Sequence, residues 1–139
     1  MQIFKYKDKL TYGVAMRDFV KLCKALSDET RLRILSILLE RECCVCEVMQ
    51  ALDISQTRAS RNLAVLYEAG FLRLRKDGLW SIYSIDKGST NEYSSDLVRV
   101  VNKALKQNKA LEHDRERLRK AVRVGPSCAE KMRGEKTIA

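Results

Sequence analysis

The sequence predicts a mainly helical fold with one small β-hairpin: a winged helix-turn-helix that is dimeric and has a long C-terminal helix. Two short helical segments joined by a tight turn predict the helix-turn-helix. An Asp-Gly turn between two segments of alternating polarity predicts the hairpin, which is the wing. With 139 residues, one Pro and six Gly, the chain has the length of one domain and little scope for long loops.

The first two expected helices differ in their apolar patterns. The first covers about residues 15–25, where apolar side chains recur at spacings of three and four. Cys23 lies on this apolar face and is expected to be a small buried side chain. The second covers about residues 28–40, follows an N-cap hydroxyl at Ser27 with acids in its first turn, and is nearly apolar on all sides. We therefore expect the second helix at the centre of the core.

The helix-turn-helix and the wing follow directly. The first of its two helices is expected from Cys44 to Leu52, and the second, the recognition helix, opens at Ser55 and closes before Gly70. Residues 71–85 then alternate apolar side chains with basic or polar ones on both sides of the turn.

A single long helix is expected from Ser89 to about Val122. Ser89 and Glu92 form a capping-box pattern, and apolar residues continue at helical spacing. About 30 residues at 1.5 Å each give about 45 Å, more than a domain of this size covers, so part of the apolar stripe is expected to contact a second copy. The expected organisation is an N-terminal segment over 1–14, a DNA-binding and dimerisation domain over 15–123, and a polar tail over 124–139.

Composition limits the classes of partner. The 27 Lys and Arg exceed the 18 Asp and Glu, and the formal net charge of +9 favours a polyanion such as DNA, RNA or an acidic membrane surface. The sequence has neither a signal-peptide pattern nor a stretch approaching the roughly 18 apolar residues of a spanning helix, so a cytoplasmic protein is expected. Five cysteines, three of them within four residues, indicate metal or redox chemistry rather than a secreted disulfide framework.

The start of the recognition helix combines hydroxyl, amide and basic side chains, whereas Ala59, Leu63 and Leu66 are placed to face the core. Amide side chains can pair bidentately with adenine, arginine can pair with guanine or phosphate, and hydroxyls suit phosphate. A merely solvated polar face is the alternative, and the basic hairpin that follows argues against it. The candidate DNA-binding residues are Ser55, Gln56, Thr57, Arg58, Ser60, Arg61, Asn62 and Lys76.

Four segments carry a resemblance to a known family: KALSDETRLRIL at residues 24–35, CVCE at 44–47, SQTRASRNL at 55–63 and DGLWSIY at 77–83. They resemble the ArsR/SmtB-type, or arsenic-repressor, family of bacterial winged-helix metalloregulators. The resemblance implies a homodimer that binds a two-fold symmetric operator, represses it, and leaves it when the inducer binds. The chain departs from the family at Asn62, where histidine is common, and at Arg58, where a small or β-branched residue is usual. The operator sequence therefore does not carry over.

Cys43, Cys44 and Cys46 are the candidate ligands of the inducer. As(III) and Sb(III) prefer thiolates, and three sulfurs complete a trigonal pyramid around either ion. On an ideal helix, positions two apart point about 200° apart, so joint ligation by Cys44 and Cys46 is expected to strain the helix start and re-aim the recognition helix. Inducer binding would then oppose DNA binding. Glu42 and Glu47 flank the cysteines and indicate partial exposure.

The sequence leaves open which residue supplies the third sulfur ligand. The segment 44–46 matches the family's arsenic-binding Cys-Val-Cys, but Met49 stands where the family often has its third cysteine. Cys43, Cys128 in the tail and Cys23 are the candidates, and a site of two thiolates is the further alternative.

Other functions are kept as alternatives. Cd(II) or Pb(II) would suit a thiolate site, whereas Zn(II) or Ni(II) on the last helix is disfavoured because His113 is the single histidine. A redox-sensing repressor of the same fold would form a disulfide between Cys23 or Cys128 and the cysteine group. A thiol enzyme such as a phosphatase-type arsenate reductase needs an arginine six positions after its cysteine, and none of the five cysteines has one. The chain is therefore expected not to be an enzyme, and a metal-free winged-helix interaction module is the last alternative.

Overall fold

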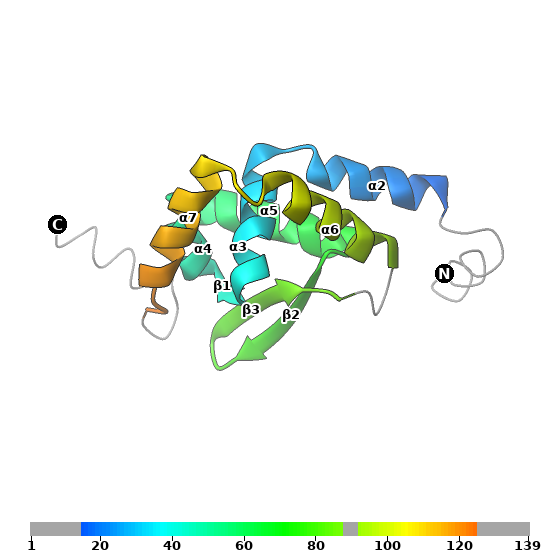
Figure 1. The fold of residues 1–139 in the computed structure, drawn as a ribbon. Helices are drawn as coiled ribbons and strands as arrows, with labels where there is room; N and C mark the ends of the chain where they lie inside the picture. Colours follow the sequence, from blue (N-terminus) through cyan, green and yellow to red (C-terminus); the bar gives the residue numbers. More distant parts are fainter. Residues whose placement is uncertain (1–14, 88–91, 125–139) are drawn as a thin grey trace.

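The computed structural model describes residues 15–87 and 92–124 and has the mainly helical winged helix-turn-helix architecture that the sequence predicts (Figure 1). The expected N-terminal segment, Ser89, and residues 125–139 of the expected tail lie outside the described residues. No helix in the described ranges has the length and apolar character needed to cross a membrane. The elements in chain order are α2 (Met16–Leu26), α3 (Glu29–Glu40), β1 (Cys43–Cys44), α4 (Val45–Leu52), α5 (Gln56–Ala69), β2 (Leu72–Asp77), β3 (Trp80–Ile85), α6 (Glu92–Leu105) and α7 (Lys109–Lys120).

Helix α3 lies at the centre of the fold, as its apolar pattern predicts. Asp28 is its N-cap, and the Asp28 carboxylate accepts a hydrogen bond from the backbone N–H of Arg31 at 3.1 Å. Residues 34–38 are all buried, and α3 contacts every other described helix and β3.

Helices α4 and α5 form the helix-turn-helix. The connection places Asp53 in the left-handed region (φ 56°), which aspartate tolerates better than most residues. Ser55 caps α5, because its Oγ accepts the backbone N–H of Arg58 at 3.2 Å, and Gly70 ends α5 with φ 101°. The predicted inner face of α5 is fully buried at Ala59, Leu63 and Leu66.

The predicted wing forms as the antiparallel pair β2 and β3, with Asp77 opposite Trp80. The third strand, β1, pairs antiparallel with β3 and has no counterpart among the elements expected from the sequence. Cys43 lies opposite Tyr83 and Cys44 opposite Ile82, and the strand order is β1-β3-β2. Two of the candidate inducer ligands therefore belong to the same sheet as the wing.

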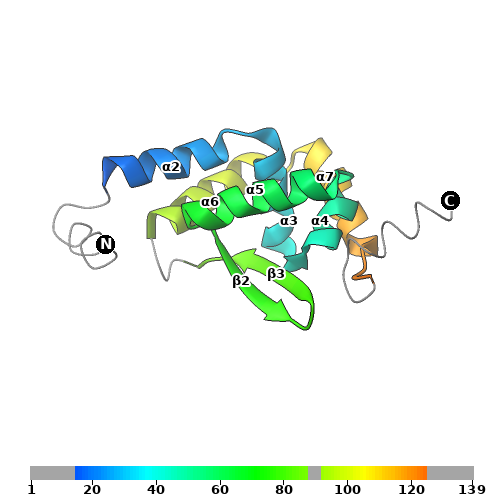
Figure 2. The same cartoon turned by 180° about the vertical axis from the view of Figure 1, so that it is seen from behind.

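The single long C-terminal helix is wrong, because α6 ends at Leu105 and α7 begins at Lys109. Asn108 causes the break: its Oδ1 accepts the backbone N–H groups of Ala110 and Leu111 and caps a new helix. Helix α7 contacts α3 and α4, beside α4 at one end of the molecule (Figures 1 and 2). The second half of the expected helix thus packs within the chain.

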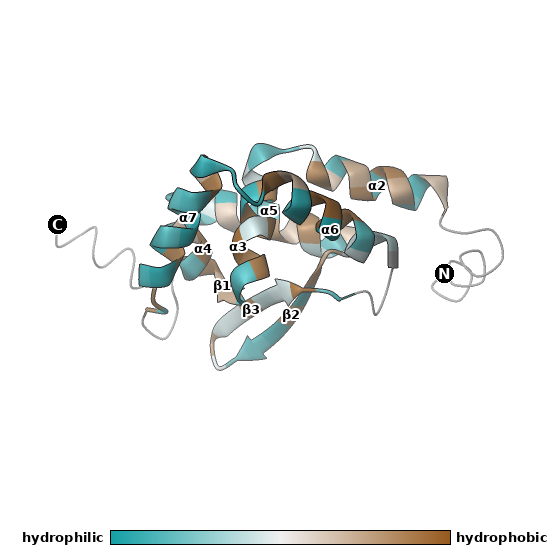
Figure 3. Ribbon diagram, in the orientation of Figure 1, coloured by the Kyte–Doolittle hydropathy of each residue, from teal (hydrophilic) through white to brown (hydrophobic). Residues whose placement is uncertain are grey.

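A buried ion pair attaches α7, which is hydrophilic along most of its length (Figure 3). Asp114, only 1% exposed, accepts hydrogen bonds from Arg33 Nε at 2.8 Å and Arg33 Nη2 at 2.9 Å. Arg117 Nη2 donates to the same carboxylate at 2.7 Å. Leu111 and Leu118 are the buried apolar residues of α7.

The apolar face of α2 is only partly buried. Leu22 and Ala25 are buried, but Met16 is 80% and Val20 42% exposed. Cys23 is exposed, which corrects the expectation that it is a small core side chain. Successive helical residues lie about 100° apart, so burial of Leu22 turns Cys23 away from the core.

Candidate nucleic-acid interface and thiol site

The first two turns of α5 present the predicted polar face to solvent. Gln56, Thr57, Ser60 and Arg61 are all exposed, and the free backbone N–H groups at a helix start suit phosphate oxygens. On the wing, Lys76 is exposed and its Nζ donates to Ser81 Oγ at 2.7 Å.

Two of the candidate DNA-binding residues, Arg58 and Asn62, contact α3. Arg58 Nη2 donates to Thr30 Oγ1 at 2.8 Å, and Arg31 Nη1 donates to Asn62 Oδ1 at 3.0 Å. Arg31 Nε also donates to the carbonyl of Ala25 at the end of α2, at 2.7 Å. These bonds fix the start of α5 on its neighbours. Sequence reasoning missed Thr30 and Arg31, because a local pattern does not show which helix a side chain will reach.

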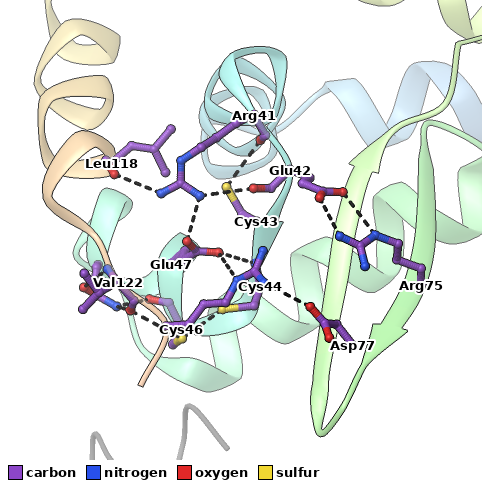
Figure 4. Close-up of polar contacts among 12 residues, drawn as sticks. Arg41, Glu42, Cys43, Cys44, Cys46, Glu47, Arg75, Asp77, Leu118 and Val122 are labelled. Atoms are coloured by element: carbon purple, nitrogen blue, oxygen red, sulfur yellow. Dashed lines mark hydrogen bonds and ion pairs between the residues drawn. The ribbon is translucent and has the colours of Figure 1, made fainter. Parts of the chain in front are cut away.

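The structure brings Cys44 and Cys46 together and leaves Cys43 apart (Figure 4). The Sγ atoms of Cys44 and Cys46 are 2.9 Å apart, whereas Cys43 Sγ donates to the carbonyl of Arg41 at 3.5 Å and packs in the main core. Successive residues of a strand point to opposite faces, which explains the separation of Cys43 from Cys44. Within the described ranges, no three or more Cys, His, Asp or Glu side chains gather as a metal site.

Two expectations about the cysteines need correction. Cys44 is not in a helix: it is the extended N-cap of α4 (φ −85°, ψ 172°), so the opposed geometry of a helix does not apply to Cys44 and Cys46. Ligation by both sulfurs therefore needs no unwinding of α4. The expected partial exposure is also wrong, because Cys43, Cys44 and Cys46 are each 0% exposed.

Glu47 organises the start of α4 and is itself buried, at 4% exposure. Its Oε1 accepts the backbone N–H of Cys44 at 2.8 Å and Arg123 Nε at 3.3 Å, and its Oε2 accepts Arg41 Nη1 at 2.7 Å. Burial opposes ionisation most strongly, but these hydrogen bonds and charges outweigh it, so the pKa of Glu47 lies below its ordinary value. The only sequence signal was an acid three residues after the N-cap, and a cysteine at the N-cap obscured it.

Burial raises the pKa of the Cys43 thiol to about 12, and burial is also the main cause that raises the pKa of Cys44. Both thiols are therefore protonated near neutral pH, and ligation of a soft ion would release protons. Cys23, Cys43 and Cys44 are free, whereas Cys46 takes part in a disulfide bond. Cys128 lies outside the described residues.

The donor set fits a thiophilic ion in part. Once the Cys46 disulfide is reduced, the paired sulfurs of Cys44 and Cys46 would supply two soft ligands in an apolar cluster with Ile82, against which Trp80 and Val124 pack. The Trp80 indole Nε1 is buried and has no hydrogen-bond partner in the described part of the chain. Cys43 lies on the opposite face of β1, apart from this pair. His113, the alternative ligand on the last helix, is exposed.

Polar contacts join residues 42–47, the segment that contains Cys43, Cys44 and Cys46, to the wing. Arg75 Nη2 forms an ion pair with Glu42 Oε1 at 2.6 Å (Figure 4). Arg123 Nη1 contacts Oδ2 of Asp77, the last residue of β2, at 3.5 Å. Because the same Arg123 also binds Glu47, the start of α4 and the wing share one guanidinium. The Arg75 contact keeps the pKa of Glu42 below its usual value.

Comparisons with known proteins agree with this arrangement. The sequence profile of "Bacterial regulatory protein, arsR family" matches residues 28–73, from the N-cap of α3 into β2. The chain is 49% identical over 67 residues to the arsenical resistance operon repressor of Escherichia coli (strain K12), covering 48% of this chain and 57% of that protein. It is 43% identical over 70 residues to the cadmium resistance transcriptional regulatory protein CadC homolog of Staphylococcus aureus, covering 50% and 58%. The match thus spans less than two thirds of either relative.

Among solved structures, the chain is similar to the homodimeric winged helix-turn-helix DNA-binding domain Mb0332 from Mycobacterium bovis, described as a possible ArsR-family regulator. The TM-score is 0.56 at 27% identity, over 67% of this chain and 82% of that one. The profile covers the entire helix-turn-helix together with Cys44 and Cys46. The chain is also 39% identical over 66 residues to the uncharacterized HTH-type transcriptional regulator MJ1325 of Methanocaldococcus jannaschii, covering 47% of this chain and 74% of that protein. The chain therefore belongs to the arsR family of bacterial regulatory proteins, which are DNA-binding transcriptional regulators and not enzymes.

Proposed function

We propose that the chain is a transcriptional repressor that binds operator DNA as a homodimer and leaves it when As(III) or Sb(III) binds Cys44 and Cys46. The observation that carries the proposal is the pair of sulfurs 2.9 Å apart at the start of the helix-turn-helix, beside a strand paired with the wing. The similarity to an arsenical resistance repressor supports this inducer. The similarity to a cadmium regulator makes Cd(II) the alternative inducer.

In this proposal the exposed residues of α5, Gln56, Thr57, Ser60 and Arg61, enter the major groove, while Lys76 binds phosphate. Ser55 caps the helix, and Arg58 and Asn62 hold it against α3. A net charge of +9 supports association with DNA. Exposed apolar residues on α2 and α6 support an interface between two copies: Met16, Phe19, Val20 and Val100.

Release follows from the connections of Cys44. The Cys44 and Cys46 thiolates would hold the inducer by donating electron pairs to the soft ion. In the protein whose Cys46 disulfide has been reduced by a cellular thiol, Cys44 and Cys46 would each release a proton to solvent on ligation. A shift of Cys44 would then act on Glu47, whose carboxylate accepts the Cys44 backbone N–H. Glu47 is tied to Arg123, and Arg123 to Asp77 at the wing, so a shift of Cys44 reaches both α4 and the wing. Typical couplings of about 1–3 kcal/mol correspond to a fall in operator affinity of about 5–150-fold.

The test is fluorescence anisotropy of the reduced protein with DNA from just upstream of its own gene, titrated with arsenite, antimonite, cadmium, zinc or peroxide. We expect arsenite and antimonite to release the DNA. Cys46→Ser should bind DNA without release, while the matched variant Cys43→Ser should still be released, because Cys43 lies apart from the pair. Arg61→Ala should weaken DNA binding and leave arsenite affinity nearly intact. Absence of DNA binding by the wild type would contradict the repressor role.

A redox-sensing repressor is the second candidate, favoured by the disulfide of Cys46. It predicts release by peroxide in the absence of metal and recovery of DNA binding on reduction. If peroxide leaves DNA binding unchanged while arsenite abolishes it, the disulfide does not control the operator.

A further inference from the structure

The four residues that follow α7, residues 121–124, lie over the thiol pair and are here called the strap. Val124 packs against the cluster of Cys44, Cys46 and Ile82. The carbonyl of Val122 is 3.9 Å from Cys46 Sγ (Figure 4). The family profile ends at residue 73, so α7 and the strap lie beyond the segment that defines the family match.

Two side chains hold the strap down. Gln50 of α4 donates from Nε2 to the carbonyl of Val122 at 2.8 Å, and its Oε1 accepts the Val122 N–H at 3.2 Å. Arg123 bridges Glu47 and Asp77. The strap is therefore latched to α4 from one side and to the wing from the other.

The contacts that hold α7 are more buried than the Gln50 and Arg123 contacts that hold the strap, which are here called the latch. Upstream, α7 is anchored by the buried Asp114 and by Arg117, whose Nε donates to the carbonyl of Ala51 at 2.8 Å. The latch bonds are partly exposed, since Gln50 is half-buried and the Arg123 side chain is 28% exposed. Water can replace partly exposed hydrogen bonds at small net cost, so the strap can open while α7 stays docked.

We propose that Gln50 and Arg123 are positioning residues of the thiol site, and that the strap they hold selects small ligands by controlling access to Cys44 and Cys46. Cys44 and Cys46 are 0% exposed, and the strap contacts their cluster through Val122 and Val124, so lifting the strap is the opening that we assign to an incoming reagent. A small opening admits a compact trihydroxy arsenic species and excludes an aryl-substituted one. This inference rests on the proposed function for its ligand, but the closure of the strap is measurable without DNA or metal.

The test is alkylation of the reduced, full-length protein by iodoacetamide and by the bulkier N-phenylmaleimide, followed for each cysteine by peptide mass spectrometry. The variants are Gln50→Ala and Arg123→Gln. Arg119→Gln removes the same charge from the exposed face of α7 and is the matched control. Two cysteines calibrate the experiment: Cys23 is exposed and reports reagent activity, and Cys43 is buried in the main core and reports global unfolding.

We expect Gln50→Ala and Arg123→Gln, the latch variants, to raise the rate at which N-phenylmaleimide modifies Cys44 by about tenfold, because each variant loses one or two partly exposed hydrogen bonds. The rate with iodoacetamide should rise less. Cys43 and the Arg119→Gln control should stay unchanged. Equal acceleration of Cys43 and Cys44, an unchanged Cys44, or equal acceleration by both reagents would each overturn the inference. In parallel, the fluorescence of Trp80, the single tryptophan, reports the binding of arsenite and of phenylarsine oxide in separate titrations. The latch variants should bind phenylarsine oxide more tightly and arsenite with unchanged affinity. These outcomes do not depend on whether the chain represses transcription.

Discussion

Replacing Asp114 with Ala is expected to lower the free energy of unfolding by about 3–5 kcal/mol, the usual effect of removing one partner of a buried ion pair. Asp114 is 1% exposed and accepts three hydrogen bonds, two from Arg33 at 2.8 and 2.9 Å and one from Arg117 at 2.7 Å. The hydrogen bond from Arg33 to Asp114 is the main cause that raises the pKa of Arg33. Without the carboxylate, a guanidinium whose side chain is 23% exposed loses its counter-charge. Arg33 keeps one acceptor, the carbonyl of Leu52, which places the expected loss near the lower end.

A loss of about 3 kcal/mol is a large part of the usual 5–15 kcal/mol of a domain and corresponds to a fall of about 10–15 °C in Tm. The measurement is urea and thermal unfolding followed by circular dichroism. Asp96→Ala, which breaks the exposed pair with Arg99 (side chains 55% and 71% exposed), is the control and should cost less than about 1 kcal/mol. If the two variants lose the same stability, Asp114 does not anchor α7 and the reasoning fails.

Three further predictions concern other sites. Burial raises the pKa of Cys43 to about 12, so its contribution to stability is complete below the unfolded pKa and is lost as pH rises toward the folded one. Above about pH 8.5 the free energy of unfolding should fall by about 1.4 kcal/mol per pH unit, as measured by urea titration. Cys43→Ala should reduce this slope. An unchanged slope in Cys43→Ala would show that another group causes the pH dependence. Gly70→Ala should lower the free energy of unfolding by about 1–2 kcal/mol in the same assay, because Gly70 has φ 101°. The added Cβ meets no atom within 4 Å, so the loss would come from the backbone conformation alone. An unchanged urea midpoint would show that the turn relaxes. Arg58→Ala should weaken operator binding in anisotropy less than Arg61→Ala, because Arg58 is bonded to Thr30; the reverse order would assign the base contacts to Arg58.

The sequence predicts the fold where the signal is local. Ser55 and Gly70 cap α5 at the expected places, whereas the cap of α3 is Asp28 and not the expected hydroxyl of Ser27. The turn at Asp77 and Gly78 forms the expected hairpin. The strand β1 has two residues, too few for a repeating pattern. The break before α7 was missed because the apolar spacing continues across it, whereas the Asn108 cap acts on only two N–H groups.

The candidate site was predictable in chemistry but not in geometry. The choice of sulfur ligands followed from the residue types. Whether the Cys44 and Cys46 side chains point apart or toward each other depends on Cys44 being an N-cap rather than a helical residue. The flanking acid Glu47 suggested exposure because its partner Arg123 is 76 positions away in the sequence. Contacts of that range depend on how α7 folds back, which no local pattern records.

The strand β1 also affects self-association. It covers the edge of β3 that β2 leaves open, and β3 carries no charged residue. The opposite edge, β2, has Arg73, Arg75 and Lys76, and charges on an edge strand discourage pairing with other chains. If β1 left β3, the backbone groups of Ile82 and Tyr83 would become a template for intermolecular sheet formation. Cys43, which lies outside the thiol pair, packs in the main core and so holds β1 on that edge of β3.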